Sequence, residues 1–540
     1  MTKPSSIPTP VIWCIAGIDS GGGAGLAADQ RAADAFGVHA CTVVAAVTAQ
    51  STKAVQRIEA TEPAMLDAQL RALAEDMLPV VIKTGMLGSA ENARRVAHWV
   101  QKFRHSNHPV KLVVDPVLRA STGASLADDA LVRAYREALV PLCDVITPTR
   151  REAQILTGLA EDACARELAA HLCALGAQSA VVTGGDDEKL SPDLACDWLE
   201  TPHAKGWLYL RRRAIAHNHG TGCTFASSVA AAMAMGFVAA DAAVLAKMAT
   251  MHAIRHARPV GMGAGPVIAR GGFGTDSGLL PRLSIGQDMP QSWRPPAPSP
   301  RSPGLYAIVG TAEQAQAVMQ VRNGAHTVQL RMKRPADMAA DDPSWQEQLK
   351  NEIESAIAAA STSSACLVIN DHWRTALACG AKALHLGQED LLALTRDDWQ
   401  ALESARASHG VQIGVSSHSL WELCRAASIS PELIACGPVW PTTTKDMPWV
   451  PQGLRNLAWW AYMAPAPVVG IGGVLEPDQM RAIAASGAQG GCVVRGLGED
   501  PSRSLPAWRH AWDQGCTSSS PGAAPPLPHP TLSPHSAEIH

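Results

Sequence analysis

The sequence lacks the features that would direct it to a membrane, to nucleic acid or to an oxidising compartment. Its formal net charge is only −4, so no excess charge favours nucleic acid or an anionic surface. No apolar run is long enough to cross a bilayer, and the run 11–18, preceded only by Lys3, predicts a first strand instead of a signal peptide. The 13 cysteines include no Cys-x-x-Cys pair or zinc spacing, which is typical of reduced thiols. We therefore expect a cytoplasmic protein with small-molecule partners.

The length of 540 residues is too great for a single core and predicts two domains. Strand-like runs rich in β-branched residues alternate with Ala-rich helical runs in both halves, which indicates α/β folds with mainly parallel sheets. A segment crowded with Pro and Ser, 281–303, predicts a linker between domains at 10–280 and 304–515. The Ser/Pro/His-rich segment 516–540 predicts a disordered tail.

Two glycine-rich segments mark the first domain. The loop 17–25 follows a strand, but it has neither the Gly-Lys-Ser/Thr of a P-loop nor GxGxxG spacing, which disfavours Walker-type and dinucleotide sites. The second segment, 218–224, precedes a small-residue helix at 225–235. Its glycines expose backbone N–H groups at a helix start, which suits a phosphoryl anion. There Cys223 is predicted to have a lowered pKa and to act as base or nucleophile, or alternatively to be an inert cysteine in a helix entry.

Eight ordered segments in the first domain carry a family resemblance. They read AGIDSGGGAGLAAD, VTAQST, KTGMLG, VDPV, ITPTRREA, VTGGD, HGTGCTF and GMGAGP. Together they resemble the hydroxymethylpyrimidine and phosphomethylpyrimidine kinases, which use ATP and have a ribokinase-like α/β domain. The resemblance implies an anion hole from the backbone of Gly220, Thr221 and Gly222, with Cys223 in the base position. It implies that the pyrimidine pocket is lined by Gly17, Ala24, Asp29, Gln50, Met86 and Val117.

The nucleotide side of this domain is predicted from two acidic residues and two departures from the family. Asp115 and Glu152 follow strands and would act through Mg2+ or its waters, or alternatively Asp115 caps a turn and Glu152 a helix start. The resembling family commonly has Asn at the position of Thr149 and often Lys at that of Thr183. His217 and His219, beside the glycine turn, are interpreted as structural.

The second domain repeats a strand-then-helix unit eight times, which predicts a TIM barrel with its site at the C-terminal strand ends. Carboxylates there suit Mg2+, while Lys, Arg and Thr suit a pyrophosphate and glycines a phosphate. These strand ends carry Gln329, Arg331, Lys333, Asn370, Asp371, Gln388, Glu389, Asp390, Ser416, Thr442, Thr444, Lys445, Gly472 and Gly473.

The segments QLRMK, IND, HLGQED, GVSSH, PTTTK and GIGG resemble the thiamine-phosphate synthases in their order. The resemblance implies that Asp371 and Asp390 bind Mg2+ and that Gly472 and Gly473 help to bind the thiazole phosphate. It also implies a pyrophosphate and substrate site made by Arg331, Lys333, Asn370, Thr442, Thr444 and Lys445. Arg495 departs from the family, which usually has a Ser there.

Taken together, the resemblances imply a bifunctional enzyme of thiamine biosynthesis, in which one half supplies the substrate of the other. One alternative is a pyridoxal-type kinase joined to a thiazole tautomerase-like barrel. Another is a pyrimidine-binding sensor whose kinase half has lost turnover. Ribokinase-like kinases often dimerise, so we also expect a homo-oligomer.

Overall fold

The computed structural model describes residues 8–118, 127–185, 191–213, 216–297, 302–442, 448–518 and 524–532. The chain divides into two compact units, which meet in the sequence at Trp293 and Arg294. Each unit is described by itself. Among the described helices, none is long and apolar enough to span a membrane.

The first unit is built on a ten-stranded sheet in the order β10-β9-β8-β7-β6-β5-β4-β1-β2-β3. Six adjacent strands are parallel: β7 (Ala180–Val182), β6 (Val145–Ile146), β5 (Lys111–Val114), β4 (Val81–Thr84), β1 (Val11–Asp19) and β2 (His39–Gln50). Antiparallel strands flank them: β3 (Val55–Ala60) on one side, then β8 (Leu194–Glu200), β9 (Lys205–Arg211) and β10 (Arg282–Leu283) on the other. The predicted α/β fold with a mainly parallel sheet is confirmed.

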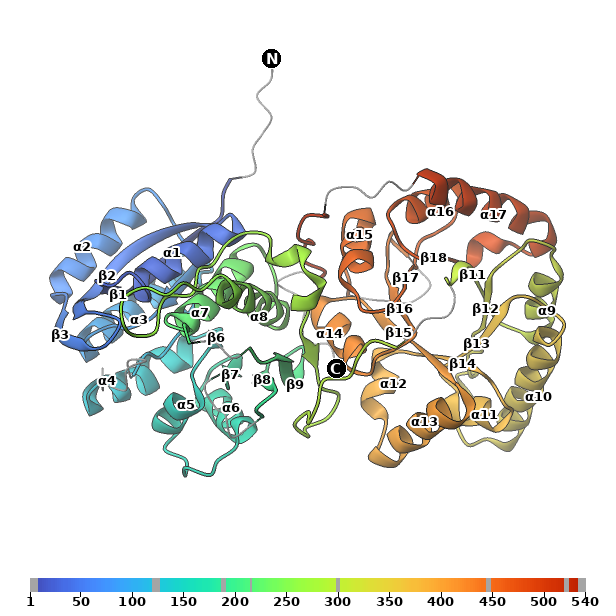
Figure 1. The fold of residues 1–540 in the computed structure, drawn as a ribbon, viewed down its shortest axis with the longest axis horizontal. Coiled ribbons are helices and arrows are strands. Elements are labelled where there is room, and N and C mark those ends of the chain that lie inside the picture. The colour runs from blue at the N-terminus through green and yellow to red at the C-terminus, as the bar shows by residue number, and fades with distance from the viewer. Residues whose placement is uncertain are drawn as a thin grey trace, which may run out of the picture. The chain divides into compact units, whose positions relative to one another are not determined.

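Helices cover both faces of this sheet (Figure 1). One face carries α2 (Pro63–Ala74), α3 (Ala90–His105), α4 (Asp129–Ala134), α5 (Arg150–Thr157) and α6 (Ala165–Ala174), whose apolar residues join one core with the strands. The other carries α1 (Gly25–Phe36), α7 (Thr221–Ala234) and α8 (Ala239–Arg255). The apolar run of α7 is buried from Thr224 to Met233, because α1, α8 and the sheet surround it.

The second unit is a closed barrel of eight parallel strands, so the predicted TIM barrel is confirmed (Figure 1). Its strands are β11 (Gly304–Val309), β12 (Thr327–Leu330), β13 (Cys366–Asn370), β14 (Ala383–Leu386), β15 (Gln412–Ser417), β16 (Leu433–Cys436), β17 (Val468–Gly470) and β18 (Gly490–Val493). The helices are α9 (Ala312–Gln320), α10 (Pro343–Ala360), α11 (Trp373–Ala378), α12 (Gln388–Ala393), α13 (Arg396–His409), α14 (Leu420–Ser428), α15 (Gly453–Met463), α16 (Pro477–Ala485) and α17 (Pro501–Ser518). Tyr306, Ile308 and Val368 fill the interior with neighbouring apolar side chains.

The structure differs from the sequence prediction at both proline-rich segments. Part of the predicted linker 281–303 forms β10, which pairs with β9, and Trp293 packs against Arg282 and Tyr209. Part of the predicted disordered tail 516–540 is also ordered, since α17 runs to Ser518 and residues 524–532 pack on the barrel. Composition suggested disorder, but proline fixes φ and so lowers the entropy cost of ordering an extended segment.

Candidate active sites

The first site lies at the carboxyl ends of the parallel strands, where the loop after β1 meets the turn before α7. Asp19, at the end of β1, accepts hydrogen bonds from the backbone N–H groups of Gly21 (2.8 Å), Gly23 (3.0 Å) and Ala24 (2.9 Å). Burial favours a higher pKa for Asp19, but the hydrogen bonds from His219 and these amides outweigh it and lower the pKa. The Asp19 carboxylate therefore fixes the backbone conformation of the glycine loop 17–25.

His219 joins the two glycine-rich segments. Its Nε2 lies 2.9 Å from Asp19 Oδ2 and 3.4 Å from Gln50 Nε2. A Cβ on Gly220 would lie 2.2 Å from Gly23 O, so only glycine allows the two backbones to approach so closely. The structural interpretation of His219 fits these contacts, whereas the role of Asp19 was not predicted from the sequence.

The start of α7 can accept an anion. Gly220 is its N-cap residue with φ 85°, and no side chain of the described residues caps the helix. Apart from its chain neighbours and the backbone of its own helix, no described atom lies within 4 Å of where a Cβ on Gly222 would be. Thr221 N already donates to Asn218 O at 3.3 Å, and the other N–H groups of this first turn lie at the positive end of a helix dipole, which favours a bound phosphoryl group.

A buried ion cluster lies beside this turn. Lys83 Nζ, at the end of β4, is 2.8 Å from Asp29 Oδ1 and 3.5 Å from Asp115 Oδ2. Ser227, on α7, donates a 2.7 Å hydrogen bond to Asp29 Oδ1. Lys83 and Asp29 are fully buried, and although burial disfavours the charged amine, the carboxylates raise the pKa of Lys83. The cluster ties α1, α7, β4 and the end of β5 together.

Burial also changes the acid–base properties of the predicted catalytic residues. It raises the pKa of Asp115 to about 6, against the opposing effect of Lys83. Likewise, the pKa of the Cys223 thiol is raised to about 12, chiefly because surrounding protein excludes water. The prediction of a lowered thiol pKa is therefore wrong, since desolvation and nearby carboxylates outweigh the helix start and Lys83.

The predicted pyrimidine-lining residues fall into two groups. A Cβ on Gly17 would lie 2.3 Å from Met86 Cε, so these two residues are in contact, and Gln50 lies beside His219. Ala24 and Val117 are partly exposed at the same strand ends. Asp29, in contrast, is fully buried and already bound by Lys83 and Ser227.

Glu152 has the helix-capping contacts that the sequence analysis considered as an alternative. It forms a capping box with Thr149 at the start of α5, and also accepts a hydrogen bond from Leu118 N at 3.3 Å. Burial and the nearby charge of Asp115 raise the pKa of Glu152 to about 7. Thr149 pairs with Thr183 in an isolated parallel bridge. The two positions at which this chain departs from the family therefore lie side by side.

The barrel site rests on a buried network of uncharged groups. Tyr306 OH donates to Gln329 Oε1 at 2.7 Å, and Gln329 Nε2 donates to Asn370 Oδ1 at 2.8 Å. On the next strands, His385 Nε2 lies 2.9 Å from Ser416 Oγ, and burial lowers the pKa of His385 to about 4. Tyr306 and His385 were missed, although both are polar residues at alternate, inward positions of a strand.

Polar groups above this network follow β12, β13 and β14. Asp371 has a left-handed backbone with φ 62°, a conformation that Asp tolerates better than most residues and that often occurs at functional sites. Asp390 accepts a 2.9 Å hydrogen bond from Gly387 N at the start of α12. Gln388 donates to Ser416 O, whereas Arg331 is partly exposed and Lys333 and Glu389 are exposed.

The glycine turn after β17 packs against the segment that follows β16. Gly472 and Gly473 have φ values of 97° and 71°, and a Cβ on Gly473 would lie 2.7 Å from Pro441 O. Trp440 N donates to Gly472 O at 3.0 Å. Thr442 follows Trp440 by two residues, so this hydrogen bond brings the backbone that precedes Thr442 to the glycine turn. Thr444 and Lys445 lie outside the described residues. Arg495 is exposed at the start of a short 3₁₀ helix, Arg495–Leu497.

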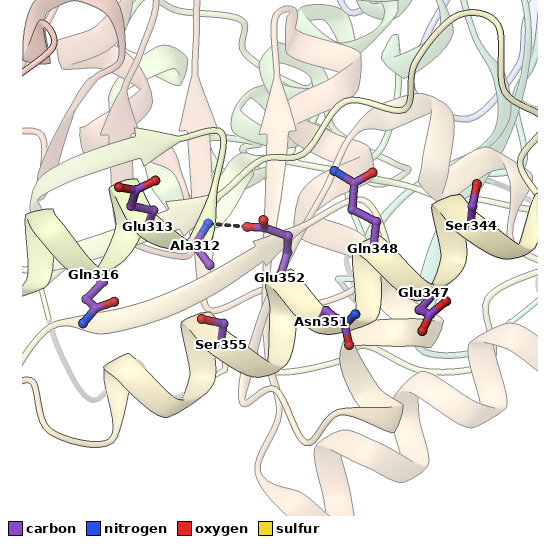
Figure 2. A pocket seen from close by; sticks show the side chains of 9 residues that line it. All are labelled: Ala312, Glu313, Gln316, Ser344, Glu347, Gln348, Asn351, Glu352 and Ser355. Atoms are coloured by element: carbon purple, nitrogen blue, oxygen red, sulfur yellow. Dashed lines mark hydrogen bonds between the residues drawn. The ribbon is translucent and has the colours of Figure 1, made fainter.

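A further hollow lies on the outside of the barrel, between α9 and α10 (Figure 2). Its most notable contact is the 2.5 Å hydrogen bond from Ala312 N to Glu352 Oε2, which caps α9. The lining residues are Ala312, Glu313, Gln316, Ser344, Glu347, Gln348, Asn351, Glu352 and Ser355. None of them is a predicted site residue, and the contact with α9 is a capping interaction.

The fold and the two sites define a class of protein: two small-molecule transferases on one chain, the first suited to phosphoryl groups. Residues 19–268 match the family model described as phosphomethylpyrimidine kinase, and residues 305–497 match that of thiamine monophosphate synthase.

Similar proteins with both halves are found in plants. A probable thiamine biosynthetic bifunctional enzyme of Oryza sativa subsp. japonica is 31% identical over 516 residues, covering 92% of this chain and 87% of the relative. That of Arabidopsis thaliana is 31% identical over 491 residues, covering 88% and 87%. Both names carry the word chloroplastic. The pyridoxal kinase of Staphylococcus aureus with ADP is a similar solved structure: 26% identical, covering 48% of this chain and 93% of that one, with TM-score 0.44.

The chain therefore belongs to the bifunctional thiamine biosynthetic enzymes. It is an ATP-using hydroxymethylpyrimidine and phosphomethylpyrimidine kinase joined to a thiamine-phosphate synthase, as the two family models together indicate. The pyridoxal-type, tautomerase-like and sensor alternatives are not favoured. The cytoplasmic location and the homo-oligomer stay predictions.

Proposed function

We propose that the first site phosphorylates 4-amino-5-hydroxymethyl-2-methylpyrimidine twice, and that the barrel joins the diphosphate to thiazole phosphate, giving thiamine phosphate and pyrophosphate. The observation that carries the kinase assignment is the start of α7, which no side chain of the described residues caps and at which Cys223 lies beside Asp115. Because the product of one site is the substrate of the other, a single chain keeps both steps together.

In the kinase site, the backbone at Gly220, Thr221 and Gly222 holds the transferring phosphoryl group, for which Thr221 N would exchange its 3.3 Å hydrogen bond to Asn218 O. The pyrimidine lies against Gly17, Ala24, Gln50, Met86 and Val117. Asp29 accepts hydrogen bonds from Lys83 and Ser227 and so stabilises this pocket without touching the pyrimidine ring.

Cys223 positions the attacking hydroxyl group. With its pKa raised to about 12, the thiol is mostly neutral, so it orients the alcohol through weak hydrogen bonds instead of acting as a strong base. Phosphoryl transfer passes through a loose transition state, in which positioning matters more than early loss of the hydroxyl proton.

Mg2+ fits both sites to different degrees. Asp115, whose Oδ2 lies 3.5 Å from Lys83 Nζ, still has carboxylate lone pairs for a role toward the metal or its waters, whereas Glu152 is already occupied as a cap. In the barrel, Asp371 and Asp390 supply two carboxylates, and Mg2+ commonly completes such a set with substrate phosphates and water. Bound there, the metal would neutralise charge on the departing pyrophosphate.

The remaining barrel residues hold the two substrates. Arg331, Lys333 and Thr442 bind the pyrophosphate group with Thr444 and Lys445, while Asn370 is oriented by Gln329 and Tyr306. As the pyrophosphate leaves the pyrimidine methylene, the thiazole nitrogen attacks that carbon. Gly472 and Gly473, with Ser416 nearby in the ring of strand ends, hold the thiazole phosphate.

The test uses the purified full-length chain with the hydroxymethylpyrimidine, ATP, Mg2+ and thiazole phosphate. Thiamine phosphate should form, with both pyrimidine phosphates appearing before it. The Cys223→Ala variant should lose kinase turnover but keep synthase turnover when the diphosphate is supplied. Undiminished kinase turnover in Cys223→Ala would refute the role of Cys223, and absence of thiamine phosphate with the full-length chain would refute the function.

A further inference from the structure

The GMGAGP segment, residues 261–266, follows α8 and packs on the turn between β2 and β3. Gly263 N donates to Thr52 Oγ1 at 3.1 Å, and Thr52 lies two residues after Gln50. A Cβ on Gly261 would lie 2.6 Å from Thr52 Oγ1, and a Cβ on Gly263 would lie 2.0 Å from Thr52 O. Glycine at these two positions therefore allows the segment to approach the turn so closely.

The other end of the GMGAGP segment is fixed to the turn before α7. His219 N donates to Gly265 O at 3.2 Å, and Val267 N donates to His219 O at 3.0 Å. Gly265 N donates to His217 Nδ1 at 3.1 Å. A Cβ on Gly265 would lie 1.9 Å from Arg258 O, so the chain folds back tightly here. These contacts hold the end of the segment beside the residues that precede the anion-binding glycines.

Two further contacts close a circuit around the kinase site. Ser20 Oγ donates to Gln50 O, and Gln50 N donates to Ser20 Oγ, both at 2.8 Å. His219 Nε2 and Asp19 Oδ2 lie 2.9 Å apart. Four segments are thus linked, each to the next and the last to the first: the loop 17–25, the end of β2 with its turn, the GMGAGP segment, and the turn 217–220. In the proposed mechanism, the GMGAGP segment alone among them has no role.

The composition of the GMGAGP segment suits a neutral ring better than a phosphate. It contains no charged residue, and its largest side chain, Met262, is 82% exposed. Methionine is flexible and polarisable and contacts aromatic rings favourably, whereas phosphates are bound by cationic side chains or helix starts. The segment is also bonded to the turn that follows Gln50, which is assigned to the pyrimidine. Its chemistry therefore matches the pyrimidine better than the nucleotide phosphates.

We propose that the GMGAGP segment forms one wall of the pyrimidine site and that Thr52 is the positioning residue that holds this wall. The inference rests on the proposed function, in which Gln50 contacts the pyrimidine. Without the Thr52 hydroxyl, the segment keeps its bonds to the turn before α7 but loses the one at Gly263. Part of the binding free energy must then be used to order the wall when the substrate binds. The turn before α7 keeps its own contact with Asp19, so phosphoryl transfer from the bound substrate changes little.

The experiment measures the kinase kinetics of the full-length Thr52→Val variant, which keeps the shape of the side chain and removes its hydroxyl. The KM for hydroxymethylpyrimidine should rise about tenfold, while the KM for ATP and kcat change less than about twofold. Thr52→Ser keeps a hydroxyl and should restore the KM to within about twofold of that of the unsubstituted protein. Ser51→Ala, at the neighbouring exposed position, is the matched control. A general structural defect would alter the KM for ATP and kcat as well.

A second variant changes the same contact from the other side. Gly261→Ala places its Cβ against Thr52 Oγ1, so it should also raise the KM for the pyrimidine and leave that for ATP unchanged. This variant carries the test if Thr52→Val does not fold. Calorimetric titration with hydroxymethylpyrimidine, without ATP, should show the same weakening in both variants.

An unchanged KM and affinity for the pyrimidine in Thr52→Val would overturn the proposal, as would an equal rise in the KM for ATP. The titration needs no turnover, so it separates this proposal from the proposed function. If the unsubstituted chain binds the pyrimidine but does not phosphorylate it, the proposed function fails, whereas the role of Thr52 is still decided by the change in affinity.

Discussion

The two units bury polar groups at their sites in opposite ways. Beneath the kinase site lie charges: Lys83 is held between the carboxylates of Asp29 and Asp115. Beneath the barrel mouth lie uncharged groups, in the chain from Tyr306 through Gln329 to Asn370. An isolated buried charge costs far more than an isolated amide or hydroxyl, so the first arrangement fails if one member is removed, whereas the second tolerates removal better.

The largest expected effect is on the charged cluster. Lys83→Met leaves Asp29 and Asp115 without their cation and should destabilise the first unit by about 3–5 kcal/mol. Urea denaturation measures this, with Lys53→Met, at an exposed position, as control. Adding Asp29→Asn to Lys83→Met should recover part of the stability. If Lys83→Met lowered the free energy of unfolding no more than Tyr306→Phe does, the proposed difference between buried charges and buried uncharged groups would be contradicted.

The next effect tests the barrel's charged groups, which lie at its mouth. Asp371→Asn keeps the left-handed backbone, since Asn tolerates it, but removes a proposed Mg2+ ligand. Synthase kcat/KM should fall by about 10²–10³-fold with little change in stability. Asp397→Asn, exposed in the first turn of α13, is the control. A large fall in stability instead of activity would contradict the assignment.

His385 gives the barrel a pH dependence. Its pKa is lowered from 6.5 to about 4 because the buried ring is held neutral, so the unfolded chain binds the proton first. The stability of the barrel should fall as pH decreases from about 6.5 to about 4, by at most about 3 kcal/mol. Denaturation with a chelator present measures the slope, which His385→Gln should flatten. Equal slopes of stability against pH for the unsubstituted protein and for His385→Gln would exclude a contribution from His385.

A smaller effect is expected from the neutral network. Tyr306→Phe removes one hydrogen bond to Gln329 and should cost about 1–2 kcal/mol, with kinase activity kept and synthase activity lowered only through the weaker orientation of Asn370. Tyr462→Phe, at a position 48% exposed, should cost nothing measurable and serves as control. A cost comparable to that of Lys83→Met would show that charge is not the decisive difference.

The smallest effect concerns the hollow in Figure 2. Glu352→Gln weakens the cap on α9 and should cost about 0.3–1 kcal/mol without changing kinase or synthase turnover. Thermal unfolding and both assays provide the measurements. A changed KM for a substrate of the kinase or of the synthase would show that the hollow belongs to a substrate site.

The fold was predictable because each strand and helix carries its own local pattern, and strand ends then place Asp115, Asn370 and Asp371 without further information. The pairing of Lys83 with Asp29 was not predictable, since 54 residues separate them and they meet only because α1 packs on β1, which pairs with β4. The pKa of Cys223 was predicted with the wrong sign, because it depends on tertiary burial, which a helix-start motif does not contain. The packing of residues 524–532 on the barrel was missed because composition describes solubility and not the partner on which a segment packs.

The packing of residues 524–532 against the barrel also concerns the order in which the chain is made. Synthesis proceeds from the N-terminus, and domains commonly fold as they emerge. The first unit can be complete while the barrel is still being translated, and residues 524–532 leave the ribosome after all eight strands of the barrel. An interrupted translation would therefore release a chain with a finished kinase and a barrel that lacks its final contacts.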